Sequence, residues 1–169
     1  MPYGLMILSY RIDLEAEEIE PEFRVEAKEN MDEEVDVEKM FSLDDRFRVY
    51  YAHTAGESGT TAGTGAGYYT GRLRDSRCSI ISFYSGLAKD TSKPEYLITA
   101  LIQPDESFDI FKDIMEEYRN ESLRLLDKLG DNDERLIGTK LYKEVHDKLD
   151  STLKYILFQM SRLVNLNNE

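Results

Sequence analysis

The chain has 169 residues, of which 41% are hydrophobic and 33% charged, and its formal net charge is −13. This length suits one domain with a buried core, and the negative charge argues against a nucleic-acid partner, because phosphate binding needs clustered Lys and Arg. No apolar run approaches the roughly 20 residues that span a bilayer, and a single cysteine, Cys78, suits a reducing compartment. We therefore expect a cytoplasmic single domain over residues 1–169 without a transmembrane segment.

The negative charge is concentrated in one segment. Residues 13–45 carry 15 acidic and 3 basic side chains, whereas residues 46–102 carry 4 acidic and 7 basic ones. Such a segment forms either a solvated acidic face or a docking surface for a basic partner.

The N-terminal half begins with two predicted strands. Residues 3–12 are apolar at both alternating sets of positions, as in a central strand covered on both faces. Residues 19–28 alternate between apolar and charged side chains, and Pro21 places them at an edge or a strand start. We expect these two strands to form a hairpin, followed by a short helix within 35–43 and a third strand at 46–53, where Phe47, Val49 and Tyr51 alternate with polar neighbours.

The remaining strands and two long helices complete the pattern. Strands are predicted from near Tyr68, over 77–87 and over 95–103. The apolar period then becomes helical over 107–130, with Ser107 or Asp105 as N-cap and Gly130 as a left-handed C-terminal residue, and again over 134–164, with Leu141, Val145 and Leu149 beginning its buried stripe. The fold class is α+β: about five mostly antiparallel strands, a short helix and two long C-terminal helices packed on the sheet in longin/profilin-like layering.

A Gly/Thr-rich segment at residues 54–67 interrupts this pattern. It has no P-loop lysine, its glycines do not open a helix as a dinucleotide fingerprint does, and the residues around Ser58 depart from G-x-S-x-G. The segment is therefore expected to be a flexible loop that serves either as a disordered connection or as a binding loop. Its flank favours binding, because Tyr and Arg are enriched at interface hot spots; the candidate partner-binding residues are Tyr68, Tyr69, Arg72 and Arg74.

The usual catalytic and metal-binding patterns are missing from the sequence. His53 and His146 lack neighbouring Cys or His, so no metal site is predicted, and His146 is expected on a helix surface. Cys78 is expected to be a buried strand residue. We identify no catalytic residues and no cofactor site, and the chain is expected to be non-enzymatic.

The order of the elements resembles the longin-like and roadblock-like group of domains. The resemblance rests on a strand pair opening on "GLMILSYRID", a small helix, a three-stranded meander and a C-terminal helix pair, with residues 96–126 at the turn from the last strand into a helix. It concerns topology, not motif, and covers about two-thirds of the chain. Members of this group are non-catalytic scaffolds that bind small GTPases, vesicle-trafficking machinery or their own copies. The resemblance thus implies an adaptor with a small GTPase or trafficking-type partner.

Two other hypotheses stay open. In the first, the chain is a small-molecule-binding or hydrolytic domain that uses the Gly/Thr-rich loop as a lid, with Arg72, Arg74 or Arg77 facing an anionic ligand. In the second, it associates with itself through a sheet edge or the long helices.

Overall fold

Five antiparallel strands form one sheet in the part of the chain that the computed structural model describes, residues 1–12, 17, 20–54, 68–86, 94–130 and 133–169. The strands lie in the order β2-β1-β5-β4-β3. With the helices they follow one another along the chain as β1 (Gly4–Ile12), β2 (Pro21–Asn30), α1 (Val37–Met40), α2 (Leu43–Thr54), β3 (Tyr68–Arg72), β4 (Ser79–Tyr84), β5 (Glu95–Ile102), α4 (Phe108–Asp127), α5 (Asp133–Leu136) and α6 (Lys140–Asn167). The predicted α+β class is confirmed.

The strand pair at the N-terminus is the predicted hairpin. β1 pairs with β2 on one side and with β5 on the other, and a bulge interrupts the β1–β2 register between Ile7 and Leu8. β1 is therefore central and buried on both faces, while β2 lies at an edge of the sheet. Both predictions for these strands are confirmed.

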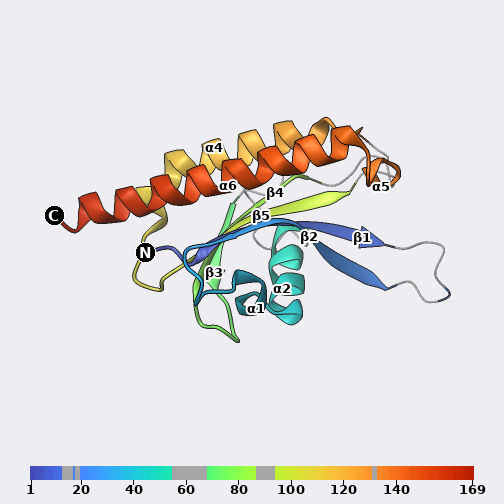
Figure 1. Cartoon of the computed structure of the whole chain (residues 1–169). Helices are drawn as coiled ribbons and strands as arrows, with labels where there is room; N and C mark the ends of the chain where they lie inside the picture. The colour runs from blue at the N-terminus through green and yellow to red at the C-terminus, as the bar shows by residue number, and fades with distance from the viewer. Residues whose placement is uncertain (13–16, 18–19, 55–67, 87–93, 131–132) are drawn as a thin grey trace.

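The long helices α4 and α6 cover one face of the sheet (Figure 1). Their apolar stripes bury Phe111, Met115, Leu149 and Ile156 against side chains of all three central strands. Tyr118 is fully buried and its hydroxyl donates to the backbone carbonyl of Met6 at 3.1 Å. This side of the molecule thus holds the larger of two apolar clusters, as the helical periodicity predicts.

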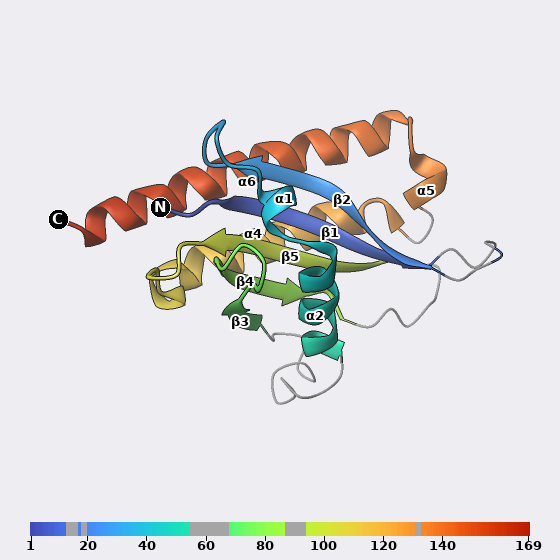
Figure 2. The same ribbon diagram turned by 90° about the horizontal axis from the view of Figure 1, so that it is seen from below.

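The opposite face carries the short helices α1 and α2, seen in front of the sheet in Figure 2. The expected helix within 35–43 is confirmed as α1. The predicted strand at 46–53 is wrong, because these residues lie in α2. Its buried face includes the polar Asp45 and His53, so the apolar residues do not show a helical period.

The ends of the C-terminal helices follow local capping chemistry. Ser107 caps α4 by accepting from the backbone N–H of Asp109, as expected. Gly130 has the expected left-handed conformation, with a φ of +65°, but it does not end the helix, because α4 stops at Asp127 with Lys128 as its C-cap. The single helix predicted over 134–164 is wrong in its first turns. Gly138, at a φ of +84°, separates α5 from α6, and Thr139 caps α6.

Three further expectations concern single segments. Cys78 is 2% exposed, as expected of a buried residue, and it immediately precedes β4. None of the described helices is long and apolar enough to cross a bilayer. The Gly/Thr-rich loop lies outside the described residues apart from Thr54, the last residue of α2.

Candidate functional site

Aromatic side chains gather between α2 and the β1–β2 hairpin. We call this group the aromatic surface, and it consists of Tyr10, Phe23, Phe47, Tyr50 and Tyr51. Tyr10 comes from β1, Phe23 from β2 and the other three from α2, so the group exists only once the helix lies on the sheet.

The rings form a continuous series of contacts. Tyr10 stacks on Tyr50 with 4.1 Å between ring centroids, and Phe23 meets Phe47 edge-on at 5.0 Å. Phe47 is in turn 6.2 Å from Tyr51. The separations of the Phe23–Phe47 and Phe47–Tyr51 pairs are those of favourable aromatic pairs, which contribute about 0.5–1.5 kcal/mol each beyond their buried area.

The outer part of this group reaches solvent. Leu43, Phe47 and Tyr51 are spaced four residues apart on α2 and therefore share one side of the helix. Leu43 is 56% exposed and Tyr51 is 54% exposed, whereas Tyr50 is buried. Large apolar side chains gathered on a surface in this way are typical of a protein-binding patch.

Glu95 anchors the inner part of the aromatic surface. The hydroxyl of Tyr50 donates to one carboxylate oxygen of Glu95 at 2.8 Å, and the hydroxyl of Tyr84 donates to the other. Burial, reinforced by the hydrogen bond to this carboxylate, raises the pKa of both phenols above the ordinary range. Both tyrosines therefore stay protonated donors, and they fix the α2 side of the surface to β4 and β5.

A histidine–serine pair lies beside this anchor. Nε2 of His53 is 3.0 Å from Oγ of Ser82, and the imidazole stacks on the ring of Tyr84 with 5.5 Å between centroids. The pair has the spacing of a base and a nucleophile. However, His53 is 4% exposed and Ser82 is 0% exposed, so a substrate cannot reach the hydroxyl. Burial lowers the pKa of His53 to about 4, and the pair serves to hold α2 on β4.

A buried carboxylate fixes the other side of α2. Asp45 accepts from the backbone N–H groups of Arg74 at 3.1 Å and Asp75 at 3.3 Å, and its side chain pairs with Arg48 at 2.7 Å. These bonds join the first turn of the helix to the connection between β3 and β4. The helix that presents Tyr51 is thus held at both ends by hydrogen bonds to the meander.

The candidate residues Tyr68, Tyr69, Arg72 and Arg74 do not form one surface. Tyr68 stacks on Phe108 at the start of α4, with 4.3 Å between centroids, whereas Tyr69 faces His53 on the other side of the sheet. Successive strand residues point to opposite faces, which explains the separation.

The two arginines have structural contacts close to the same turn. Nε of Arg72 donates to the carbonyl of Arg77 at 2.9 Å, and the backbone N–H of Arg74 donates to Asp45. Both side chains are exposed. Of the four candidates, Tyr69 is the residue that approaches the aromatic surface, through His53 and Tyr84.

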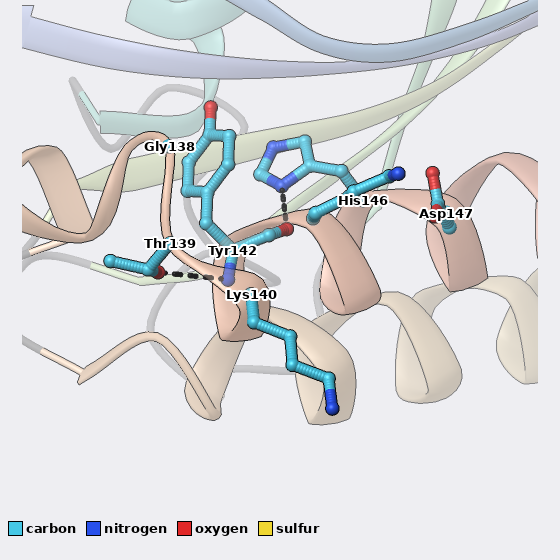
Figure 3. Close-up of a pocket in the computed structure, with 7 residues that line it drawn as sticks. Gly138, Thr139, Lys140, Tyr142, His146 and Asp147 are labelled. Atoms are coloured by element: carbon cyan, nitrogen blue, oxygen red, sulfur yellow. Dashed lines mark hydrogen bonds between the residues drawn. The ribbon is translucent and has the colours of Figure 1, made fainter.

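A separate hollow of about 540 Å³ opens at the start of α6 (Figure 3). It is lined by Gly138, Thr139, Lys140, Tyr142, Lys143, His146 and Asp147. The ring of Tyr142 stacks on the imidazole of His146 at 4.0 Å, and Nδ1 of His146 is 3.0 Å from the carbonyl of Tyr142. Arg72, Arg74 and Arg77 are not among the lining residues.

His146 belongs to a partly buried ionic network, and with its side chain 17% exposed the expectation that it lies on the helix surface is wrong. Its Nε2 is 3.0 Å from Glu26 on β2, which also accepts from Ser9 at 2.6 Å and contacts Arg11 and Arg24 at 3.1 Å. Burial alone would raise the pKa of Glu26, but the hydrogen bonds and positive charges around it lower that pKa to about 2.

Both ring nitrogens of His146 face acceptors, one the carbonyl of Tyr142 and one the carboxylate of Glu26. Burial favours the neutral ring, but these two acceptors outweigh it and raise the pKa of His146. The network is therefore an ion pair that joins α6 to β2. His146, which lines the hollow, thus serves as a structural link between these two elements.

Comparison with known families and proteins adds no relative: no family model, curated protein or solved structure matches this chain.

The aromatic surface is not predicted from the sequence, because it depends on α2, whose residues 46–53 have the pattern of a strand. One signal for that helix is present, however. Ser42 and Asp45 have the spacing of a capping box, and Oγ of Ser42 accepts from the backbone N–H of Asp45 at 3.3 Å. Together with the acidic first turn, Asp44 and Asp45, this signal predicts a helix that begins at residue 43.

Proposed function

We propose that this chain is a non-enzymatic protein-binding module that engages its partner through the aromatic surface on α2. The observation that carries the proposal is the stripe formed by the exposed Leu43 and Tyr51 and the half-buried Phe47, continuous with Phe23 and Tyr10 on the sheet. Aromatic residues dominate the centres of protein interfaces, because they bury a large area with few rotatable bonds.

The charge around this surface defines the chemistry of the partner. The exposed carboxylate of Asp44 lies next to Leu43 in the first turn of α2. We therefore propose as partner a folded protein with an apolar centre and a basic group at the edge that meets Asp44, since like charges across an interface are costly.

The resemblance to longin-like and roadblock-like domains supports a small GTPase or a trafficking-type protein as that partner. The element order on which the resemblance rests, a strand pair, a short helix, three strands and a helix pair, is found in the described chain with two additions, the helix α2 after α1 and the short helix α5 between α4 and α6. We propose a cytoplasmic adaptor on these grounds, with protein and not nucleic acid as its ligand.

A pull-down with two matched variants tests the proposal. Tyr51→Asp places a charge on the exposed outer part of the aromatic surface, whereas Ile137→Asp places one at an equally exposed position between α5 and α6, 53% against 54% exposed. We expect a protein captured by the unmodified chain at moderate salt to be reduced roughly tenfold or more by Tyr51→Asp, because it loses an interface hot spot. Ile137→Asp should leave its recovery unchanged.

Three results would contradict the proposal: no captured protein, equal loss in both variants, or equal retention in both. Circular dichroism melts of both variants show that each remains folded. A parallel thermal-shift screen against nucleotides and metabolites separates the alternative function, because stabilisation by several degrees without a protein partner would favour a small-molecule site.

A further inference from the structure

The outer side of α6 carries a second exposed stripe, unrelated to the aromatic surface. It runs along the helix at intervals of three and four residues, so its members share one side. They are all exposed, and we call them the α6 stripe: Glu144, Lys148, Ser151, Tyr155, Phe158, Arg162 and Leu166.

The α6 stripe contains large apolar side chains that face water. Tyr155 is 50% exposed, Phe158 is 61% exposed and Leu166 is 63% exposed. They alternate with the buried residues Leu149, Leu153 and Met160, which pack on the sheet from the opposite side of the same helix. Figures 1 and 2 show α6 as an outer element of the molecule along its full length.

The order of charges along the α6 stripe is asymmetric. Acidic Glu144 stands near its beginning and basic Arg162 near its end, with Lys148 and Phe158 placed symmetrically between them. Glu144 also has Lys140 at 3.8 Å on its own helix, an exposed contact of small energetic weight. A second, parallel α6 would put like charges opposite each other, whereas an antiparallel one pairs opposite charges.

We propose that this face binds a second copy of the chain, with the two α6 helices antiparallel about a two-fold axis beside Leu153. In this register Glu144 faces Arg162 of the other copy, and Lys148 lies over the ring of Phe158. Ser151, a small residue, faces Tyr155. Every pair is repeated by the two-fold symmetry, as an isologous interface requires.

Each of these pairs is favourable for a distinct reason. The Glu–Arg pair is a charge-assisted hydrogen bond at the rim, and the Lys–Phe pair is a cation–π contact. The Ser–Tyr pair lets the helices approach closely, because Ser151 is small and its hydroxyl already donates to the carbonyl of Asp147 on its own helix at 3.0 Å. From residue 144 to residue 162 the paired stripe is about 27 Å long at the rise of an α-helix.

Sedimentation equilibrium of the full chain over about 1 μM to 1 mM, the range of a modest helical interface, tests the inference. The unmodified chain is expected to form dimers. Glu144→Arg and Arg162→Glu should each weaken dimerisation roughly tenfold or more, because each places like charges opposite each other. The double variant Glu144→Arg/Arg162→Glu restores opposite charges in the same register and should recover the dissociation constant.

The double charge exchange also separates this geometry from other contacts. Lys39→Glu, an exposed cation on α1 on the opposite face of the sheet, is the matched control and should leave dimerisation unchanged. A chain that stays monomeric to 1 mM, a dimer insensitive to both single reversals, or a double variant no better than the singles would each overturn the inference. These results are independent of partner capture by the aromatic surface, which lies on the other side of the sheet.

Discussion

The two histidines occupy opposite electrostatic environments. His53 is enclosed by rings and a serine hydroxyl, and burial lowers its pKa to about 4. His146 stands between a carbonyl and the carboxylate of Glu26, which together raise its pKa. At pH 6.5, the ordinary pKa of histidine, folded His53 is therefore mainly neutral, whereas folded His146 is mainly protonated.

The free energy of unfolding should consequently pass through a maximum near pH 6.5, the ordinary pKa of histidine. The pKa of folded His53 is lowered, so the unfolded chain binds more protons, and stability falls as the pH drops from 6.5 towards 4, by up to about 3 kcal/mol. The pKa of folded His146 is raised, so its contribution is complete below pH 6.5 and is lost as the pH rises through that raised value.

Urea melts at intervals from pH 4.5 to 8 measure this profile. His53→Gln should flatten the acidic side and His146→Gln the basic side, each leaving the other slope unchanged. The lower limit avoids Glu26, whose lowered pKa makes its own contribution fall only as the pH drops from about 4.5 to 2. An acidic slope that survives in His53→Gln would show that another group titrates there.

Among the elements, α2 and α6 show two ways in which apolar periodicity misleads. In α2 the buried set includes Asp45 and His53, while Leu43 and Tyr51 are exposed, so the pattern is partly inverted. In α6 the expected stripe begins at Leu141, but the helix starts only at Lys140 after the Thr139 cap, and Leu141, its second residue, is 41% exposed.

Two leucines of α6 provide a matched measurement of this difference. Leu149→Ala should lower the free energy of unfolding by about 2–5 kcal/mol, since Leu149 is 0% exposed in the larger apolar cluster. Leu141→Ala should change it by about 0.5 kcal/mol or less, as surface substitutions do. Urea denaturation of both variants shows whether Leu141 is exposed, as in the structure, or buried, as the sequence pattern predicts. Equal losses of unfolding free energy would place Leu141 in the core.

Elements defined by their own residues could be predicted from the sequence. The β1–β2 hairpin, the helix α1, the capping Ser107 and the left-handed Gly130 all follow from patterns within a few neighbouring positions. The aromatic surface could not, because it needs Tyr10 and Phe23 to meet a helix from another part of the chain. Glu26 and His146 likewise come together only through packing of α6 on β2.

At the scale of the whole molecule, the sheet separates two unequal layers. The α4–α6 side contains the larger apolar cluster, whereas α2 buries only Val49 and Tyr50 as apolar residues and relies on polar bonds from Asp45 and His53. Polar bonds contribute less net stability than an apolar core of this size. The α2 layer should therefore open more readily than the sheet.

Native-state hydrogen exchange followed by mass spectrometry or NMR tests this ordering. Amides of β5, which is hydrogen-bonded to a strand on each side, should exchange only through global unfolding. Amides of residues 43–54 should exchange faster, through local opening, with a lower opening free energy. Equal protection of α2 and β5 would mean that the two layers unfold as one unit.

Cys78 gives this chain a useful chemical property. Its thiol is 2% exposed within the smaller apolar cluster, and burial raises its pKa. Alkylating reagents need an accessible thiolate. Cys78, the sole native cysteine, should therefore not react with them while α2 stays in place. A reporter dye can accordingly be attached at a newly introduced surface cysteine without first removing Cys78. The slow alkylation rate of Cys78 itself then measures how often the α2 layer opens.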